Sequence, residues 1–363
     1  MINLSIPILF LFGAMPFASP VDFFIAGSVN GGVPEMRKNF SIKTGDELIL
    51  YPVAVMDSQY FSPADSFRYT DGSIKKVEAD PGKLAEIKRA KVRWFKISPV
   101  LKEYDNLNPP DERSPIFWLA PVEYNVEYSD QSRLRKPLSF FDLMPEETLG
   151  TFYLTFRFDP TGEALEVMDS LSFADIKPVH MRHPYKVVQI TVRADDTYMG
   201  YLTELFNTPF ILPPKRLNTG DHQTDIRVGS DCAEFAIYGK RRQGLEVKYL
   251  GPRGIYHYLD EISPGVMRPG FDGVYTDDDN NVLDVGEGGV QPGDIIHFGE
   301  QVSVFYRDVG FEGLLDKQDS LLQSYEPAPH YTTLEYSGFF HLPVRVFRWK
   351  EDIDPIWDNP WHP

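Results

Sequence analysis

Short runs that alternate between apolar and other residues characterise the first half of the chain. In the clearest run, Thr151 to Phe158 (TFYLTFRF), the even-numbered positions are Phe or Leu and share one face, and the odd-numbered positions share the other. A period of two predicts a half-buried antiparallel strand. Comparable runs bounded by Gly, Pro or Asp predict further strands at residues 47–55, 91–97, 116–119 and 122–128.

Strands with this spacing predict an all-β domain over residues 20–186, either sandwich-like or built from two small β-modules. This segment shows no metal-ligand spacing and no nucleophile followed by a base. We therefore expect it to be an accessory domain that acts as a spacer or a binding module.

The pattern changes near Pro178 to Pro184, where two His and two Pro interrupt the alternation. We place a domain boundary here and assign residues 187–363 to a second domain. An apolar strand is predicted at residues 186–193, and Tyr198, Tyr201, Leu202 and Leu205 then recur at helical spacing. This spacing predicts a short amphipathic helix that ends before Pro209.

The stretch Val228 to Gly244 (VGSDCAEFAIYGKRRQG) predicts a second helix that carries the only cysteine of the chain. Ser230 and Asp231 are good N-caps, and three basic residues fill the last turn before the glycine. Cys232 is thus expected at a helix N-terminus, where the helix dipole lowers a thiol pKa and free N–H groups form an oxyanion hole. The alternative is a small core residue that happens to begin a helix.

Residues 289–310 predict a β-hairpin after this helix. A Pro-Gly-Asp turn leads into an apolar strand at Ile295 to Phe298, a tight turn follows at Gly299 and Glu300, and a second strand begins at Val302. The run Ser320 to Tyr325 predicts a third strand that pairs with the second.

The order DCAEF, PGDIIHFG, QVSVFYRD and SLLQSY resembles that of the NlpC-type cell-wall cysteine peptidases, a papain-like family. The resemblance covers about residues 198–341 and implies an α+β papain-like domain after the β-rich one. It implies hydrolysis of peptide or amide bonds in peptidoglycan stem peptides by a Cys-His pair, without a metal or cofactor. By the same resemblance Cys232 is the nucleophile, and we take its neighbours Ser230 and Asp231 as candidate substrate-binding residues.

The chain departs from the family pattern at the residue that would act as the general base. Gln301 occupies the position of the family's catalytic His, and Gln323 best matches the polar residue that orients it. A glutamine amide can donate a hydrogen bond but cannot accept a thiol proton. His297 lies in the same hairpin and is the nearest substitute base; alternatively, its ring packs on aromatic neighbours. His222, in the loop before the cysteine, is the next candidate.

Two functions therefore remain open. In the first, the protein is a cysteine hydrolase with Cys232 as nucleophile, His297 or another His as base, and Gln301 and Gln323 as polar supports. In the second, it is a catalytically silent relative that binds a cell-wall peptide or a protein partner.

The charge and the N-terminal sequence limit the kinds of partner and the cellular compartment that we expect. With 36 basic and 53 acidic residues the net charge is −17, which disfavours binding to nucleic acid. Residues 1–19 include an apolar stretch that is too short for a membrane span, so we expect a signal peptide, an exported protein and a mature chain without a membrane span. The alternative is a buried first strand.

We read Asp277, Asp279 and Asn281 as a hairpin turn and not as a calcium-binding loop, since Val282 stands where a calcium loop needs Gly.

Overall fold

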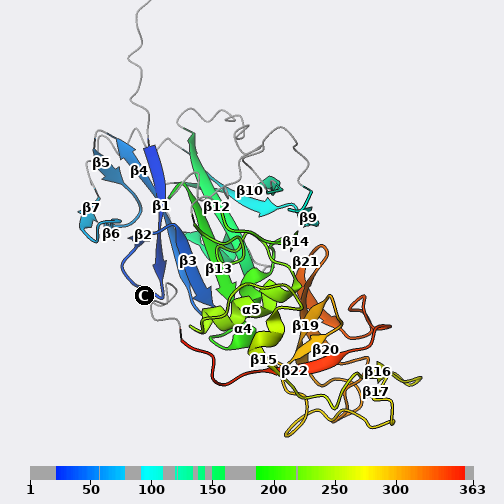
Figure 1. Cartoon of the computed structure of the whole chain (residues 1–363). Coiled ribbons are helices and arrows are strands. Elements are labelled where there is room, and N and C mark those ends of the chain that lie inside the picture. Colours follow the sequence, from blue (N-terminus) through cyan, green and yellow to red (C-terminus); the bar gives the residue numbers. More distant parts are fainter. Residues whose placement is uncertain are drawn as a thin grey trace, which may run out of the picture.

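The computed structural model (Figure 1) is rich in strands and describes residues 22–56, 58–77, 91–108, 119–120, 122–133, 138–143, 149–159, 185–217 and 220–355. The predicted signal peptide at residues 1–19 and the boundary segment at 178–184 lie outside the described residues, as does most of the strand predicted at 116–119.

The first sheet has seven strands in the order β11-β4-β1-β2-β6-β7, with β5 paired to β4. Its long strands are β1 and β4, which pair antiparallel with Phe24 opposite Val53. The strands are β1 (Asp22–Val29), β2 (Glu35–Met36), β4 (Leu48–Met56), β5 (Gln59–Phe61), β6 (Ser66–Arg68), β7 (Ile74–Lys76) and β11 (Leu138–Ser139).

The second sheet has five strands in the order β10-β8-β12-β13-β3. It packs on the first sheet through a shared core that contains Ile25 and Leu50 from one sheet and Trp94, Phe156 and Ile190 from the other. Its strands are β3 (Asn39–Lys43), β8 (Lys91–Pro99), β10 (Tyr124–Arg133), β12 (Gly150–Asp159) and β13 (Val187–Arg193), and the short helix α2 (Phe140–Leu143) adds Phe140 to the core.

Strand β13 belongs to the sheet of the first half, although its sequence position led us to assign it to the second domain. It pairs antiparallel with β12 and parallel with β3. Pairing with β3 is a contact between residues about 150 positions apart, which local sequence patterns do not encode.

Strand β12 is buried on both faces over residues 151–156, so the prediction of a half-buried strand is wrong there. Tyr153 and Thr155, on the face expected to meet solvent, are 1% and 3% exposed. The Tyr153 hydroxyl donates to the carbonyl oxygen of Arg227 at 3.3 Å, because the second half of the chain covers this face.

The second half places two helices, α4 (Tyr198–Leu202) and α5 (Cys232–Arg242), against a six-stranded sheet of order β15-β22-β18-β19-β20-β21. The core between them contains Leu202, Phe235, Ile295, Val304 and Leu322. The strands are β15 (Leu259–Glu261), β18 (Ile295–His297), β19 (Val302–Arg307), β20 (Ser320–Tyr325), β21 (Ala328–Thr333) and β22 (Arg345–Trp349).

The opposite face of this sheet is covered by long connections instead of helices. They include the short pair β16 (Arg268–Pro269) and β17 (Tyr275–Thr276). Met267, Tyr275 and Leu315 from these connections pack on Phe305 and Leu321 of the sheet. The 3₁₀ turns η2 (Thr203–Leu205) and η3 (Ile255–Tyr258) lie on the helix side, where Leu205 and Ile255 join the core around α5.

The predicted α+β papain-like domain is wrong. Strands account for 42% of the described residues and helices for about 10%, and the α-helices among them are α2, α4 and α5, of 4, 5 and 11 residues. The motif order suggested an α+β domain, but after Gly244 the sequence is dominated by Gly, Pro and Asp turns between short apolar runs, which favour strands and loops.

The two halves are joined by backbone pairing as well as by side chains. Strand β14 (Ile211–Leu212) pairs in parallel with β9 (Tyr104–Asp105), and Asn106 donates to the Pro213 carbonyl at 2.8 Å and to Gln223 at 2.9 Å. Figure 1 shows α4 and α5 between the sheets of the first half and the β18–β22 sheet. The division at residues 20–186 and 187–363 stays a prediction.

Glu204 lies at the centre of a buried ion cluster in this region. Its carboxylate accepts hydrogen bonds from Arg242 at 2.8 and 2.9 Å and from Arg227 at 3.3 Å, and it also contacts the Tyr238 hydroxyl. Ser41 of β3 donates to it at 3.3 Å from the first half. Burial alone would raise the pKa of Glu204, but the two guanidinium groups hold that pKa at about 2.

Candidate functional site

Helix α5 begins at Cys232, as the sequence predicts. Asp231 is the N-cap, and its carboxylate accepts a hydrogen bond from the Glu234 backbone N–H at 2.8 Å. The hydroxyl of Ser230, the other predicted cap, lies instead 3.1 Å from the Ser324 hydroxyl of β20. Three basic residues close the helix at Arg242, which places cations at the negative end of its dipole.

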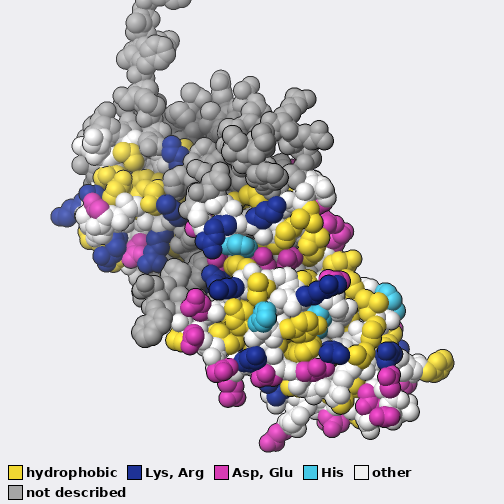
Figure 2. Space-filling view, viewed as in Figure 1, with side chains coloured by type: hydrophobic (Ala, Val, Ile, Leu, Met, Phe, Trp, Pro, Cys, Tyr) yellow, Lys and Arg dark blue, Asp and Glu magenta, His cyan; other side chains and the backbone are white. Residues whose placement is uncertain are grey.

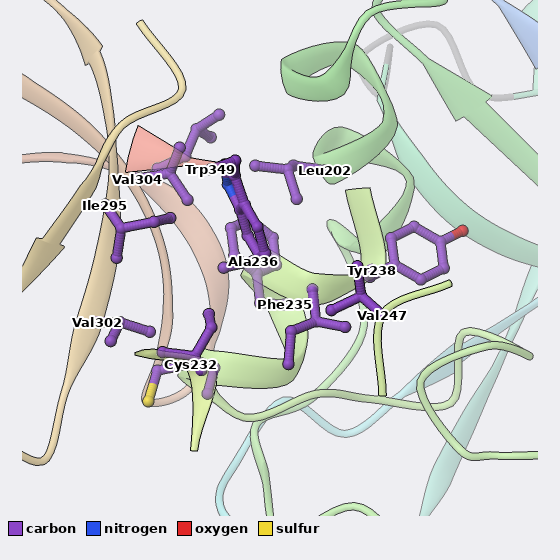
Figure 3. Packing of buried hydrophobic residues seen from close by; sticks show 14 of the residues in the cluster. Leu202, Cys232, Phe235, Ala236, Tyr238, Val247, Ile295, Val302, Val304 and Trp349 are labelled. Atoms are coloured by element: carbon purple, nitrogen blue, oxygen red, sulfur yellow. The ribbon is translucent and has the colours of Figure 1, made fainter. Parts of the chain in front are cut away.

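The Cys232 thiol is enclosed by the hydrophobic cluster of the second half. The residue is 5% exposed, and its sulfur lies 4.0 Å from the Glu300 carbonyl oxygen in the turn between β18 and β19. Figure 3 shows the sulfur at the edge of the cluster, on the side of Val302. The thiol therefore lies beside the hairpin formed by β18 and β19.

The pKa of the Cys232 thiol is strongly raised, in contrast to the lowered value expected at a helix N-terminus. Burial is the main cause, and the neighbouring Asp231 carboxylate adds to it. The backbone N–H groups of Val302 and Ala233 act in the opposite direction but do not outweigh burial. At neutral pH the sulfur is a thiol and not a thiolate.

His297 has hydrogen-bond partners of its own, and the Cys232 sulfur is not among them. Its Nε2 lies 2.9 Å from the Pro252 carbonyl oxygen, which can only accept, so Nε2 carries the proton. Its Nδ1 then accepts from the Gly299 backbone N–H at 3.0 Å and lies 3.1 Å from the Tyr256 hydroxyl. Burial lowers the pKa of His297, so the ring is neutral.

The two glutamines lie in different surroundings. Gln301 is buried, and its amide donates to the Ser324 carbonyl oxygen at 3.4 Å, near the start of α5. The Gln323 carbonyl accepts from Ser303 at 3.0 Å, and its amide lies 3.3 Å from His330 Nε2. Because Leu322 faces α5 and Leu321 packs on the opposite side, the alternation of β20 places Gln323 on the face away from Cys232.

Around the first turn of α5, Asp231 is accompanied by a second buried carboxylate, Glu234, which pattern analysis did not single out. Thr224 donates to the Glu234 carboxylate at 2.7 Å, and His222 Nδ1 lies 3.6 Å from the same carboxylate. Burial raises the pKa of Asp231 to about 6 and, together with Asp231, raises that of Glu234. The His222 ring stacks on Tyr249, and burial lowers the pKa of His222 to about 4.

Ser230 and Asp231, the candidate substrate-binding residues, are 0% and 4% exposed. Their polar groups are engaged by β20 and by the helix backbone, respectively. The structure thus brings Ser230, Asp231, Cys232 and Gln301 together, whereas Gln323 lies on the other face of the sheet and His297 bonds to Pro252 and Gly299. Glu234 and Glu204, which sequence reasoning missed, are single acids within largely apolar runs, a pattern that signals a buried, partnered carboxylate.

A surface hollow of about 410 Å³ lies away from Cys232, between the end of β22 and the segment after α5. Its lining carries both signs of charge, from Lys248 and Lys350 and from Glu246, Asp352 and Asp354. Lys350 donates to the His257 carbonyl oxygen at 3.0 Å, so one of these cations is already engaged.

The segment from Asp277 to Asn281 forms a turn, as the sequence predicts. The Asp277 carboxylate accepts from the backbone N–H groups of Asp279 and Asn281 at 2.9 and 2.8 Å, and Thr276 bridges to Val282. Within the described part of the chain, no group of three or more His, Cys, Asp or Glu side chains is placed to hold a metal ion.

No family model, curated protein or solved structure matches this chain. Among the described residues, no helix is long and apolar enough to cross a membrane. The resemblance to the NlpC-type peptidases therefore rests on the sequence motifs alone.

Proposed function

We propose that this protein binds a peptide or protein partner without cleaving it. The observation that carries the proposal is the state of Cys232: the thiol is enclosed, its pKa is raised, and no imidazole of the described residues lies within hydrogen-bond distance of its sulfur. A cysteine nucleophile needs a thiolate or a base that takes the thiol proton.

The engagement of His297 supports this proposal. A general base must direct a free lone pair at the proton that it accepts. The only lone pair on the neutral His297 ring, at Nδ1, is used by the Gly299 N–H, and Nε2 is protonated toward Pro252. Moving this ring to Cys232 would break both hydrogen bonds and its stacking on Tyr256.

Gln301 supports the same conclusion. At the position that matches the family's catalytic His, its amide connects the start of β19 to the backbone of β20. This is a structural contact that an amide makes well, whereas proton acceptance from a thiol is beyond its chemistry.

The experiment is a cleavage assay on purified peptidoglycan with the full chain and with Cys232→Ala. We expect no soluble stem-peptide fragments above the level of the Cys232→Ala control, measured by mass spectrometry. Release of fragments by wild type that Cys232→Ala abolishes would overturn the proposal.

A cysteine hydrolase acting on peptidoglycan peptides is the second candidate. It is favoured by the position of Cys232 at the first residue of α5, at the positive end of the helix dipole, and by the motif order. Gln301→His, with Gln301→Asn as control, tests whether a base at this position activates the thiol. Alkylation of Cys232 at pH 7 that rises at least tenfold only in Gln301→His would show a latent catalytic geometry. Export through residues 1–19 stays a prediction under both candidates.

A further inference from the structure

Two long connections of the second half are joined by backbone hydrogen bonds at one end of the molecule. Tyr275 donates its backbone N–H to Leu315 at 2.9 Å, and Leu315 donates to Leu283 at 2.8 Å. Lys317 donates to Gly273 at 3.0 Å, so residues 268–290 and 308–317 form a continuous backbone network. We call these two ranges the acidic end.

The acidic end exposes large apolar side chains although a complete core lies beneath it. Phe271, at the tip between β16 and β17, has 112% of its reference surface exposed, and Phe311 has 54%. Val282 and Val309 are 44% and 49% exposed. Tyr275, Leu283 and Leu315 already fill the core below, so the exposed side chains contribute little to folding.

Negative charge surrounds these side chains. The two ranges contain nine acidic residues and two basic ones. Both basic residues are paired, Arg268 with Asp278 at 2.6 Å and Lys317 with Glu335 at 3.8 Å. Figure 2 shows acidic side chains gathered at this end and an apolar projection at its edge. Asp279, Glu287 and Glu312 are exposed and form no ion pair within the described residues.

We infer that the acidic end is a docking surface for an arginine-rich segment of a protein partner. This inference rests on the proposed binding function and names its partner's chemistry. Carboxylates at the rim attract guanidinium groups, and the exposed faces of Phe271 and Phe311 accept them through cation–π contacts. Arginine fits better than lysine because its planar group stacks on an aromatic ring while it binds a carboxylate.

The test uses the full chain and a fluorescein-labelled (Arg-Gly-Ser)₄ peptide, with binding followed by fluorescence anisotropy in 150 mM salt. A docking variant combines Asp279→Asn, Glu287→Gln and Glu312→Gln, and an aromatic variant combines Phe271→Ser and Phe311→Ser. The control combines Glu47→Gln, Glu127→Gln and Asp142→Asn, three exposed acids of the first half, and changes the net charge by the same amount.

We expect Kd to rise about tenfold in the docking variant and about fivefold in the aromatic variant, with less than a twofold change in the control. Wild type without measurable binding, a docking variant that binds like wild type, or a control that weakens binding equally would overturn the inference. Cys232→Ala should bind like wild type, and the cleavage assay reads a different site. Loss of the proposed function and loss of this docking surface are therefore distinguishable.

Discussion

The imidazole of His297 stacks on the phenol ring of Tyr256, with ring centroids 4.5 Å apart and an angle of 19° between the planes. The ring centroids of Tyr256 and Phe347 are 4.9 Å apart, so the histidine is one layer of an aromatic stack at the end of β18. This relationship gives His297 a structural role that its position in the hairpin alone did not reveal. The alternative that we stated from sequence, a ring packed on aromatic neighbours, describes its surroundings.

His297→Ala should therefore lower stability without changing the reactivity of Cys232. Loss of the stacked ring and of two hydrogen bonds should cost about 2–4 kcal/mol of unfolding free energy, measured in urea. His257→Ala, at an exposed histidine, is the control and should cost less than about 0.5 kcal/mol. Alkylation of Cys232 slowed severalfold in folded His297→Ala would show instead that this imidazole acts on the thiol.

Gly239→Ala should destabilise the protein although alanine favours helices. A Cβ at Gly239 would lie 2.7 Å from the Tyr198 ring and 2.8 Å from Leu202, because α4 and α5 approach closely there. We expect a loss of about 1–3 kcal/mol in urea unfolding. Gly251→Ala is the matched control, since a Cβ at Gly251 would meet no atom within 4 Å. Equal stability of the two variants would contradict the close approach of the helices.

Glu204→Gln should cost about 3–5 kcal/mol, because it removes the negative charge that Arg227 and Arg242 both contact inside the buried cluster. The pKa of Glu204 is lowered to about 2, so its stabilising contribution is present above its ordinary pKa and is lost as the pH falls from about 4.5 to 2. Glu47→Gln, at an exposed acid, is the control. In thermal unfolding between pH 2 and 7, the melting temperature of Glu204→Gln should fall less steeply toward low pH than that of wild type, and Glu47→Gln should behave like wild type.

Asp231→Asn should stabilise the protein at alkaline pH. Burial raises the pKa of Asp231 to about 6, so the favourable protonated state is fully populated below about pH 4 and lost as the pH rises through 6. Asparagine keeps an oxygen for the Glu234 N–H and carries no charge. We expect the variant to gain more than about 1 kcal/mol over wild type at pH 8 and little at pH 4. Glu234 titrates nearby, so the same comparison in a Glu234→Gln background isolates Asp231. A loss of stability at pH 8 in both backgrounds would contradict the account.

Local structure was largely predictable from sequence. The caps at Asp231 and Gly244 bracket α5, and the strands predicted at residues 47–55, 91–97, 151–158 and 320–325 correspond to β4, β8, β12 and β20. Helix caps and period-two alternation act within a few residues, so they are readable in the chain. The parallel pairing of β13 with β3 and the burial of Tyr153 depend on distant segments and were missed.

The candidate site was predictable in position but not in chemistry. The sequence places Cys232 at a helix start beside the hairpin, and both features are present. A thiol pKa depends on how completely the surrounding side chains exclude water, and this is decided by residues such as Val302 that are distant in sequence. Strand alternation likewise separates Gln323 from Cys232, although the motif order suggested a shared site.

The rate of alkylation of Cys232 by iodoacetamide as a function of pH tests the central claim most directly. The chain has one cysteine, so intact-mass measurement reports this residue alone. The account predicts labelling far slower than that of an exposed thiol at pH 7, rising only at strongly alkaline pH, with the same profile in His297→Ala. Rapid labelling that reaches a plateau near neutral pH would show a thiolate poised for catalysis, and would contradict the proposal that this protein binds without cleaving.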